Sequence, residues 1–168
     1  AGKLGANIAM IGATGQDVYG TILIDNLMSV GVDTSAIARI ANQVTGAAFI
    51  TVDKKGDNSI IVVAGANKSL SKEIINQRME LIRDCDIIIM QLEIPMDVVL
   101  YVAKIAKQLG KLVILDPAPA SEYLPDELIR NIDVIKPNET ELANLTGCSI
   151  DRIEDIVFGA NKLIERGV

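Results

Sequence analysis

The clearest indication of the fold comes from residues 86–116, which read DIIIMQLEIPMDVVLYVAKIAKQLGKLVILD. Two continuous apolar runs, at 87–90 and 112–115, flank a segment with helical spacing of apolar residues that ends at Gly110. Short, continuously apolar strands are typical of parallel sheets, and parallel neighbours need a crossover connection such as a helix. The stretch therefore predicts a βαβ unit in a parallel sheet covered by helices on both faces.

The same alternation extends in both directions along the chain. Downstream it predicts a short helix, a strand and two further helices, at residues 124–129, at 133–135, from 139 and from 151. Upstream, residues 7–11 read as a strand and are followed by a helical pattern that closes at Gly31. The intervening GATGQD, residues 12–17, matches neither GxGxxG nor GxxxxGK[ST]. We therefore predict a tight turn there, with Asp17 capping the helix.

A different pattern occupies the region between these segments. Residues 36–41 and 47–52 read as short strands. The second of them is joined to residues 60–63 by turn-forming residues at 53–58, which predicts a β-hairpin after a strand.

Residues 36–64 are too few to bury a core of their own. We expect them to form a small sheet appended to an α/β body that consists of residues 1–35 and 65–168. The strands at 47–52 and 60–63 are apolar on both faces, which is unfavourable for strands exposed to water. We therefore expect the chain to form a homodimer through this small sheet.

The composition excludes several classes of function. The 168 residues carry 22 acidic and 16 basic side chains, so a net charge of −6 disfavours nucleic acid as a partner. No apolar run reaches the length of roughly 18 residues needed to span a membrane, no signal pattern opens the chain, and we expect a cytoplasmic location. The chain has no histidine, which excludes Ser-His-Asp and Cys-His catalysis. Cys85 and Cys148 show no metal-binding spacing and are expected to be small buried hydrophobes.

Polar residues follow each predicted strand of the body, at the end where ligands bind in open α/β sheets. They are Gln91, Glu93, Asp116, Lys136, Asn138, Glu139 and Glu141. Prolines stand among them, which suits a rigid rim beside a ligand because proline fixes φ. This edge is the candidate binding site.

These residues also have purely structural explanations. Glu93 fits equally well as an acidic residue near the start of a helix. Asp116, which precedes Pro117, is more typical of a turn residue. Asn138 and Glu141 have the spacing of a helix capping box, which is sufficient to explain both of them.

Six segments together carry a resemblance to a known family. They are GATGQDVYG (12–20), TGAAFITVDKKGDN (45–58), VVAGANKSLS (62–71), MQLEIP (90–95), DPAPA (116–120) and KPNETE (136–141). In this order and at these separations, the chain resembles the ribokinase-like (PfkB) carbohydrate kinase family along its whole length. The early GKLGAN stretch is similar to a sugar-binding motif of that family but lies downstream of it, so Lys3 is expected to be a surface helix residue.

The resemblance implies ATP-dependent transfer of the γ-phosphoryl group to a sugar hydroxyl, with D-ribose as the expected sugar. It implies a doubly wound α/β body with a mostly parallel sheet and a small β-sheet lid, residues 36–64. It further implies roles for single residues in sugar, ATP and Mg²⁺ binding. Apolar contacts over the sugar are expected from Ala48, Ile50 and Val62, a hydrogen bond to sugar hydroxyls from Glu93, phosphate binding from Asn138, and ordering of the water around Mg²⁺ from Glu141.

Several parts of the family pattern have no counterpart in the chain. They are the first strand with its sugar-binding aspartate, the motif that carries the catalytic base and anion hole, and the adenine and monovalent-cation loops. We therefore expect an internal fragment, incomplete at both ends and inactive alone, with the base beyond Val168 and any K⁺ site outside the chain.

Other functions are compatible with the same residues. A relative that phosphorylates another sugar or a nucleoside is the nearest alternative. A non-catalytic sugar-binding or interaction module that retains the fold is the second. A nicotinamide-dependent oxidoreductase fits the βα rhythm, but the dinucleotide fingerprint is missing from the sequence.

Overall fold

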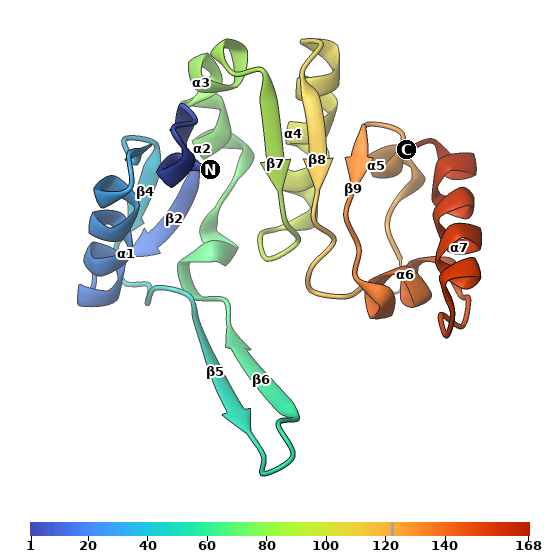
Figure 1. Ribbon diagram of the computed structural model, residues 1–168. Coiled ribbons are helices and arrows are strands. Elements are labelled where there is room, and N and C mark those ends of the chain that lie inside the picture. Colours follow the sequence, from blue (N-terminus) through green and yellow to red (C-terminus); the bar gives the residue numbers. More distant parts are fainter. Residues whose placement is uncertain (122) are drawn as a thin grey trace. The chain divides into compact units, whose positions relative to one another are not determined.

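The computed structural model describes residues 1–121 and 123–168, and the chain folds into two units, Ala1–Arg78 and Met79–Val168 (Figure 1). Unit 1 contains η1 Gly2–Leu4, β1 Ile8–Ala9, β2 Gly12–Gly15, α1 Val18–Ser29, β3 Val32–Asp33, β4 Ile37–Ile40, β5 Ala47–Val52, β6 Asn58–Val63, η2 Gly65–Ser69 and α2 Lys72–Asn76. Unit 2 contains α3 Met79–Asp84, β7 Ile87–Met90, α4 Met96–Gln108, β8 Leu112–Leu115, α5 Asp126–Ile129, β9 Val134–Ile135, α6 Glu139–Thr146 and α7 Ile153–Arg166. No helix in these described ranges is long and apolar enough to cross a membrane.

Unit 1 combines parallel strand pairs with one antiparallel hairpin. β1 pairs with β3 and β2 with β4, both in parallel, whereas β5 and β6 pair only with each other. The hairpin turns at residues 53–57, where the Gly56 N–H donates to the Asp53 carbonyl at 3.2 Å. The β-hairpin predicted from the sequence is confirmed.

The pairing of β2 differs from the sequence prediction. Residues 12–15 form a strand instead of a tight turn, and this strand pairs in parallel with β4. The sequence pattern groups residues 36–41 with the hairpin, whereas the structure joins β4 to β2 and leaves β5 and β6 as a sheet of two strands. Local pattern identifies a strand, but its partner is chosen by tertiary contacts.

Unit 2 is built on a parallel sheet in the order β7-β8-β9. In Figure 1, α4 lies behind β7 and β8, so the sheet packs on this helix through one face. The contact buries Val98, Val99, Val102, Ala103 and Ala106 of α4, together with Val113 and Leu115 of β8. Each large apolar side chain removed from water stabilises the fold by about 1.5–3 kcal/mol. The predicted βαβ unit at 86–116 is confirmed.

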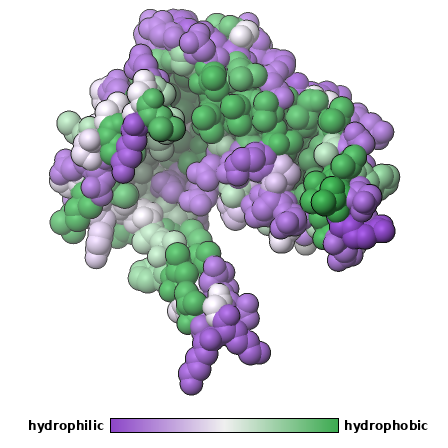
Figure 2. Space-filling view, viewed as in Figure 1, coloured by the Kyte–Doolittle hydropathy of each residue, from purple (hydrophilic) through white to green (hydrophobic). Residues whose placement is uncertain are grey.

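The other face of this sheet carries an exposed apolar row. Ile87 and Ile89 are 50% and 69% exposed, and they lie beside Leu112 and Ile114 in the register of β7 and β8. Figure 2 shows apolar side chains gathered on this face of unit 2. Within unit 2, helix α4 packs against the opposite face of the sheet and leaves this row exposed.

The cysteines are less buried than expected. Cys85 and Cys148 are both half-buried, whereas the sequence predicts small buried hydrophobes at these positions. Each thiol donates to a backbone carbonyl of a nearby helix, Cys85 to Ile82 at 3.3 Å and Cys148 to Thr146 at 3.6 Å. The polar S–H is thereby satisfied locally.

Asp133 connects three segments of unit 2: the segment before β9, strand β8 and helix α4. Its Oδ2 accepts a hydrogen bond from the buried Val113 N–H of β8 at 2.9 Å, and its Oδ1 pairs with Lys107 Nζ of α4. The hydrogen bond from Lys107, followed by that from Val113, lowers the pKa of Asp133. The carboxylate therefore ties the segment before β9 to both a helix and a neighbouring strand.

We expect Asp133→Asn to lower the free energy of unfolding by about 1.5–3 kcal/mol at pH 7, because a charged acceptor is lost from two donors. Since the folded pKa of Asp133 is lowered, its contribution is complete above the ordinary carboxyl pKa and is lost as the pH falls through the folded pKa. Urea unfolding of wild type and variant should therefore converge in acid. Glu80→Gln is the matched control, because its ion pair with Arg83 is exposed and such pairs contribute little. An equal loss in both variants would contradict the assignment.

Candidate functional site

The carboxyl ends of the three strands of unit 2 meet at one edge. Met90 lies beside Leu115, and Leu115 beside Ile135, so the residues that follow each strand form a row. The row continues beyond the strands, because the Asp116 N–H donates to the Met90 carbonyl and the Lys136 N–H to the Leu115 carbonyl, both at 2.9 Å. The polar residues that follow these strands in the sequence are therefore neighbours in space.

The loops after β7 and β8 are also joined directly. The Leu92 N–H donates to the Ala118 carbonyl at 2.9 Å. This bond fixes the loop that carries Glu93 against the loop that follows Asp116. A rim of short loops tied to each other holds its side chains in defined positions.

Asp116 is part of an ion pair that the sequence prediction did not identify. Its Oδ2 lies 3.2 Å from Lys136 Nζ, although the sequence favoured a turn residue at this position. The lysine side chain is 74% exposed, so the pair contributes little to stability but places a cation at the rim. The pairing could have been anticipated, since each residue directly follows its strand and parallel strand ends lie side by side.

Asn138 and Glu141 form the predicted capping box at the start of α6. The Glu141 N–H donates to Asn138 Oδ1 and the Asn138 N–H to Glu141 Oε2, both at 2.8 Å. Asn138 is exposed at the rim, whereas Glu141 is only 6% exposed. The structural explanation of these two residues is thus confirmed, and Glu141 Oε1 has no hydrogen bond within the described ranges.

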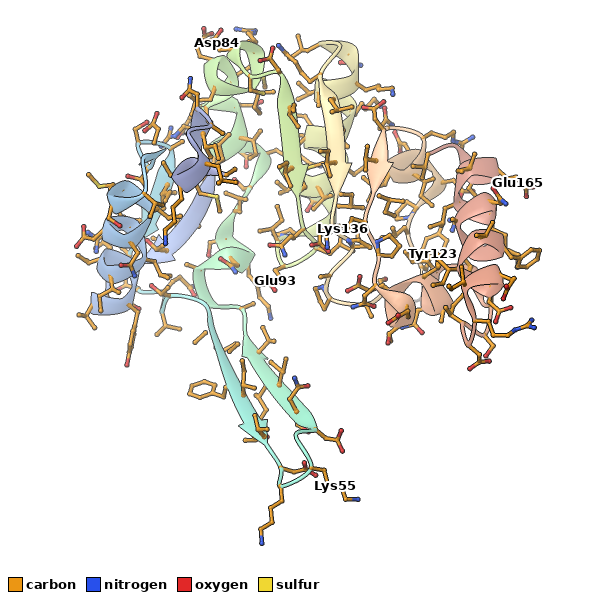
Figure 3. All side chains as sticks on the ribbon, in the orientation of Figure 1. Lys55, Asp84, Glu93, Tyr123, Lys136 and Glu165 are labelled. Atoms are coloured by element: carbon orange, nitrogen blue, oxygen red, sulfur yellow. The ribbon has the colours of Figure 1, made fainter. Side chains whose placement is uncertain are left out.

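Glu93 lies at the same end of the sheet as Lys136, as Figure 3 shows. Its side chain is exposed and has no hydrogen bond or ion pair within residues 1–121 and 123–168. The N-cap of α4 is Pro95, so Glu93 lies two residues before the helix start, as the structural explanation of an acidic residue near a helix N-terminus expects. An acceptor without an internal partner is available to a ligand.

The hairpin residues predicted for the sugar site share one face of β5 and β6 in unit 1. Ala48 is directly opposite Val62, and Ile50 lies two residues further along β5 on the same face. Ile50 and Val62 are 59% and 57% exposed. The structure therefore places Ala48, Ile50 and Val62 on one face of the hairpin. Separately, Glu93 follows β7 and the box of Asn138 and Glu141 follows β9, at the same edge of one sheet.

Within the described ranges, no group of three or more acidic, histidine or cysteine side chains is placed to hold a metal ion. Mg²⁺ keeps several waters and commonly uses only one or two carboxylates beside phosphates. The single carboxylate of Glu141, with one oxygen outside the capping box, fits that mode of binding.

Comparison with known proteins is consistent with this arrangement. The profile described as pfkB family carbohydrate kinase matches residues 1–168. The chain belongs to this family of carbohydrate kinases. The chain is 39% identical over 168 residues to ribokinase of Haemophilus influenzae. It is 34% identical to deoxyribokinase of Salmonella typhi, and both comparisons cover 100% of the chain. It superposes on Arabidopsis thaliana ribokinase complexed with ribose and ATP with a TM-score of 0.87, at 33% identity over 99% of the chain.

The chain spans about half the length of these relatives. It covers 55% of the Haemophilus influenzae and Salmonella typhi proteins and 55% of the Arabidopsis thaliana structure. The α/β fold with a mostly parallel sheet agrees with these ribokinases, as the sequence predicts.

We expect Asn138→Ala to lower the free energy of unfolding by about 1 kcal/mol, because the Glu141 N–H loses its capping acceptor. Asn138→Ser should retain most of the stability, because its hydroxyl oxygen also accepts from this N–H. Urea unfolding measures both variants. Equal destabilisation by serine and alanine would contradict capping as the origin of the effect.

Proposed function

We propose that these residues form part of an ATP-dependent sugar kinase whose sugar is D-ribose. The observation that carries the proposal is one sheet edge with two features. It carries the exposed carboxylate of Glu93, which has no partner among the described residues, and the box of Asn138 and Glu141. The similarity to ribokinase of Haemophilus influenzae, and to an Arabidopsis thaliana ribokinase complexed with ribose and ATP, supports the choice of sugar and donor. A kinase that uses ATP also fits the cytoplasmic location expected from the sequence.

Glu93 is the proposed sugar-binding carboxylate. An ionised carboxylate accepts hydrogen bonds only, and sugar hydroxyls donate them. Because Glu93 is exposed and has no partner within the described ranges, it can accept from a sugar without breaking an internal bond. Its loop is held by the bond between Leu92 and Ala118, so the acceptor is positioned before the sugar arrives.

Asn138 and Glu141 are the proposed phosphate side of the site. The start of α6 presents backbone N–H groups toward an anion, and the exposed Asn138 stands at this start. Bound Mg²⁺ would neutralise charge on the phosphates during transfer. Glu141 would hold water of that ion through the oxygen outside the capping box, while its other oxygen keeps Asn138 in place.

The hairpin face of Ala48, Ile50 and Val62 is the proposed apolar cover of the sugar. These side chains contribute no hydrogen-bonding group, and an apolar cover excludes water that would compete for the phosphoryl group. The general base and the anion hole are proposed to lie beyond Val168, and any K⁺ site outside these residues. This part of the proposal is consistent with the chain covering 55% of its relatives.

In the complete kinase, we expect Glu141→Gln to lower kcat/KM by roughly 10–100-fold, as loss of a residue that acts through metal-bound water does. The amide still accepts from the Asn138 N–H, so the free energy of unfolding should change by less than about 1 kcal/mol. Coupled ADP-release assays with Mg²⁺ and D-ribose measure the activity.

Glu139→Gln is the matched control, because Glu139 lies in the same first turn of α6 and carries the same charge but is outside the capping box. It should leave kcat/KM nearly unchanged. Equal losses in both variants would show that Glu141 contributes only its negative charge near the start of α6. The 168-residue chain alone should release no ADP, and normal turnover by it would contradict the assignment of the base to another segment.

A deoxyribose is the second candidate sugar, because the chain is 34% identical over its whole length to deoxyribokinase of Salmonella typhi. A panel of D-ribose, 2-deoxyribose, fructose and adenosine separates these candidates by kcat/KM. A preference for 2-deoxyribose would replace ribose as the substrate. Sugar binding without ADP release by the complete protein would favour a non-catalytic module.

We also propose that the chain dimerises through the hairpin, because both faces of β5 and β6 carry exposed apolar side chains. Phe49 and Ile61, opposite each other on the face away from Ala48, are 60% and 65% exposed. Phe49→Glu should therefore shift the protein toward monomer in sedimentation at micromolar concentration. Lys54→Glu, a charge change in the hairpin turn, is the control. A wild type that sediments only as monomer would exclude this interface.

A further inference from the structure

The hairpin joins the rest of unit 1 through residues 43–46 before β5 and residues 64–67 after β6, which we call the hairpin root. The two sides of the root are bonded to each other, because the Ala66 N–H donates to the Val44 carbonyl at 2.8 Å. Gly65 is required there, since a Cβ at this position would lie 2.3 Å from the Val44 carbonyl oxygen. In the root, the two chain segments therefore pack closely against each other.

Asp17 binds this root with both carboxylate oxygens. Oδ2 accepts from the Thr45 N–H at 2.7 Å, and Oδ1 accepts from the Thr45 hydroxyl at 2.5 Å. The hydroxyl oxygen of Thr45 in turn accepts from the Gly15 N–H at 3.0 Å. Thr45 is 6% exposed, so these bonds lie largely out of water.

These contacts exceed what a helix cap requires. Capping of α1 uses only the bond from the Gly20 N–H to Asp17 Oδ1, at 2.8 Å. The bonds to Thr45 join segments 28 residues apart and contribute nothing to α1. The Thr45 hydroxyl is also the largest cause of the lowered pKa of Asp17, which falls to about 2.

The close approach of the root also explains the glycine in β2. A Cβ on Gly15 would lie 2.3 Å from the Gln43 carbonyl oxygen and 2.7 Å from the Thr45 nitrogen. Glycine inside a strand commonly marks such an approach of another backbone. The root therefore packs against β2, residues 12–15, where the sequence predicted a tight turn.

The strands of the hairpin are not anchored by burial of their own residues. Every residue of β5 and β6 is exposed. The position of the hairpin relative to β2 and α1 in unit 1 therefore depends on the root. Because side chains alternate between the faces of a strand, a shift of one residue at Thr45 would turn Ala48 and Ile50 to the opposite face.

We propose that Asp17 is a positioning residue for the sugar site, which holds Thr45 and so fixes the direction and register of the hairpin face of Ala48, Ile50 and Val62. The inference rests on the proposed function for the identity of the ligand. The anchoring itself is a property of unit 1 and is measured without a sugar.

Amide hydrogen exchange of the 168-residue chain tests the anchoring, with the Ala66 N–H as reporter. This group is bonded to Val44 and does not touch Asp17 directly, so it reports on the root as a whole. Asp17→Asn and the milder Thr45→Val should each accelerate its exchange by about tenfold or more, as expected for loss of bonds to a charged acceptor. Thr45→Ser keeps both donors and should exchange as the wild type.

Asp33→Asn is the matched control. Asp33 also lies in unit 1 and accepts from the backbone N–H of Ser35 at 2.8 Å, but it has no contact with the root. Its substitution should leave the Ala66 exchange unchanged. Unchanged exchange in both Asp17→Asn and Thr45→Val would overturn the anchoring.

In the complete kinase, Asp17→Asn should raise the KM for the sugar by about tenfold, because the arrangement of the hairpin that binds sugar is populated less often. The kcat at saturating sugar and the KM for ATP should change little, and Thr45→Ser should behave as the wild type. A loosened root with an unchanged sugar KM would overturn the positioning role. A loosened root in a complete protein that phosphorylates no sugar would support the anchoring and contradict the proposed function.

Discussion

The parallel alignment of β7, β8 and β9 is the constraint on which the candidate site depends. Hydrogen bonds continue the register past the strand ends, from Asp116 to Met90 and from Lys136 to Leu115. The alignment is held from behind, where Val113 and Leu115 of β8 are fully buried on the side of α4. A shift of one residue would expose this apolar row and would also move each polar residue out of the rim.

Structural and functional explanations of the same residue are compatible in this protein. Asn138 and Glu141 cap α6 with one oxygen each, and Glu141 retains a second oxygen that has no bond within the described ranges. Asp17 caps α1 with one bond and uses its remaining capacity on Thr45. In both cases a helix start orients a carboxylate, and the carboxylate then has an acceptor left for a second purpose.

The exposed apolar surfaces have different origins in the two units. In unit 1, the hairpin is apolar on both faces, and every residue of its two strands is exposed. In unit 2, the row that contains Ile87 and Ile89 belongs to a sheet whose other face packs on α4. Apolar strands of similar composition therefore form an exposed hairpin in one unit, and in the other unit a sheet that packs on a helix through one face.

Much of the architecture follows from the sequence, because helices, the hairpin turn and the capping box depend on residues only a few positions apart. The strands at 87–90 and 112–115, the helix between them and the cap of α6 all agree with the local pattern. Family motifs likewise identify Glu93, Asn138 and Glu141 as one candidate site. The partner of β4 and the bonds of Asp17 to Thr45 were decided only by the tertiary structure. The physical reason is that each joins segments at least 20 residues apart in the chain, and no local propensity specifies which distant backbone a strand or carboxylate will meet.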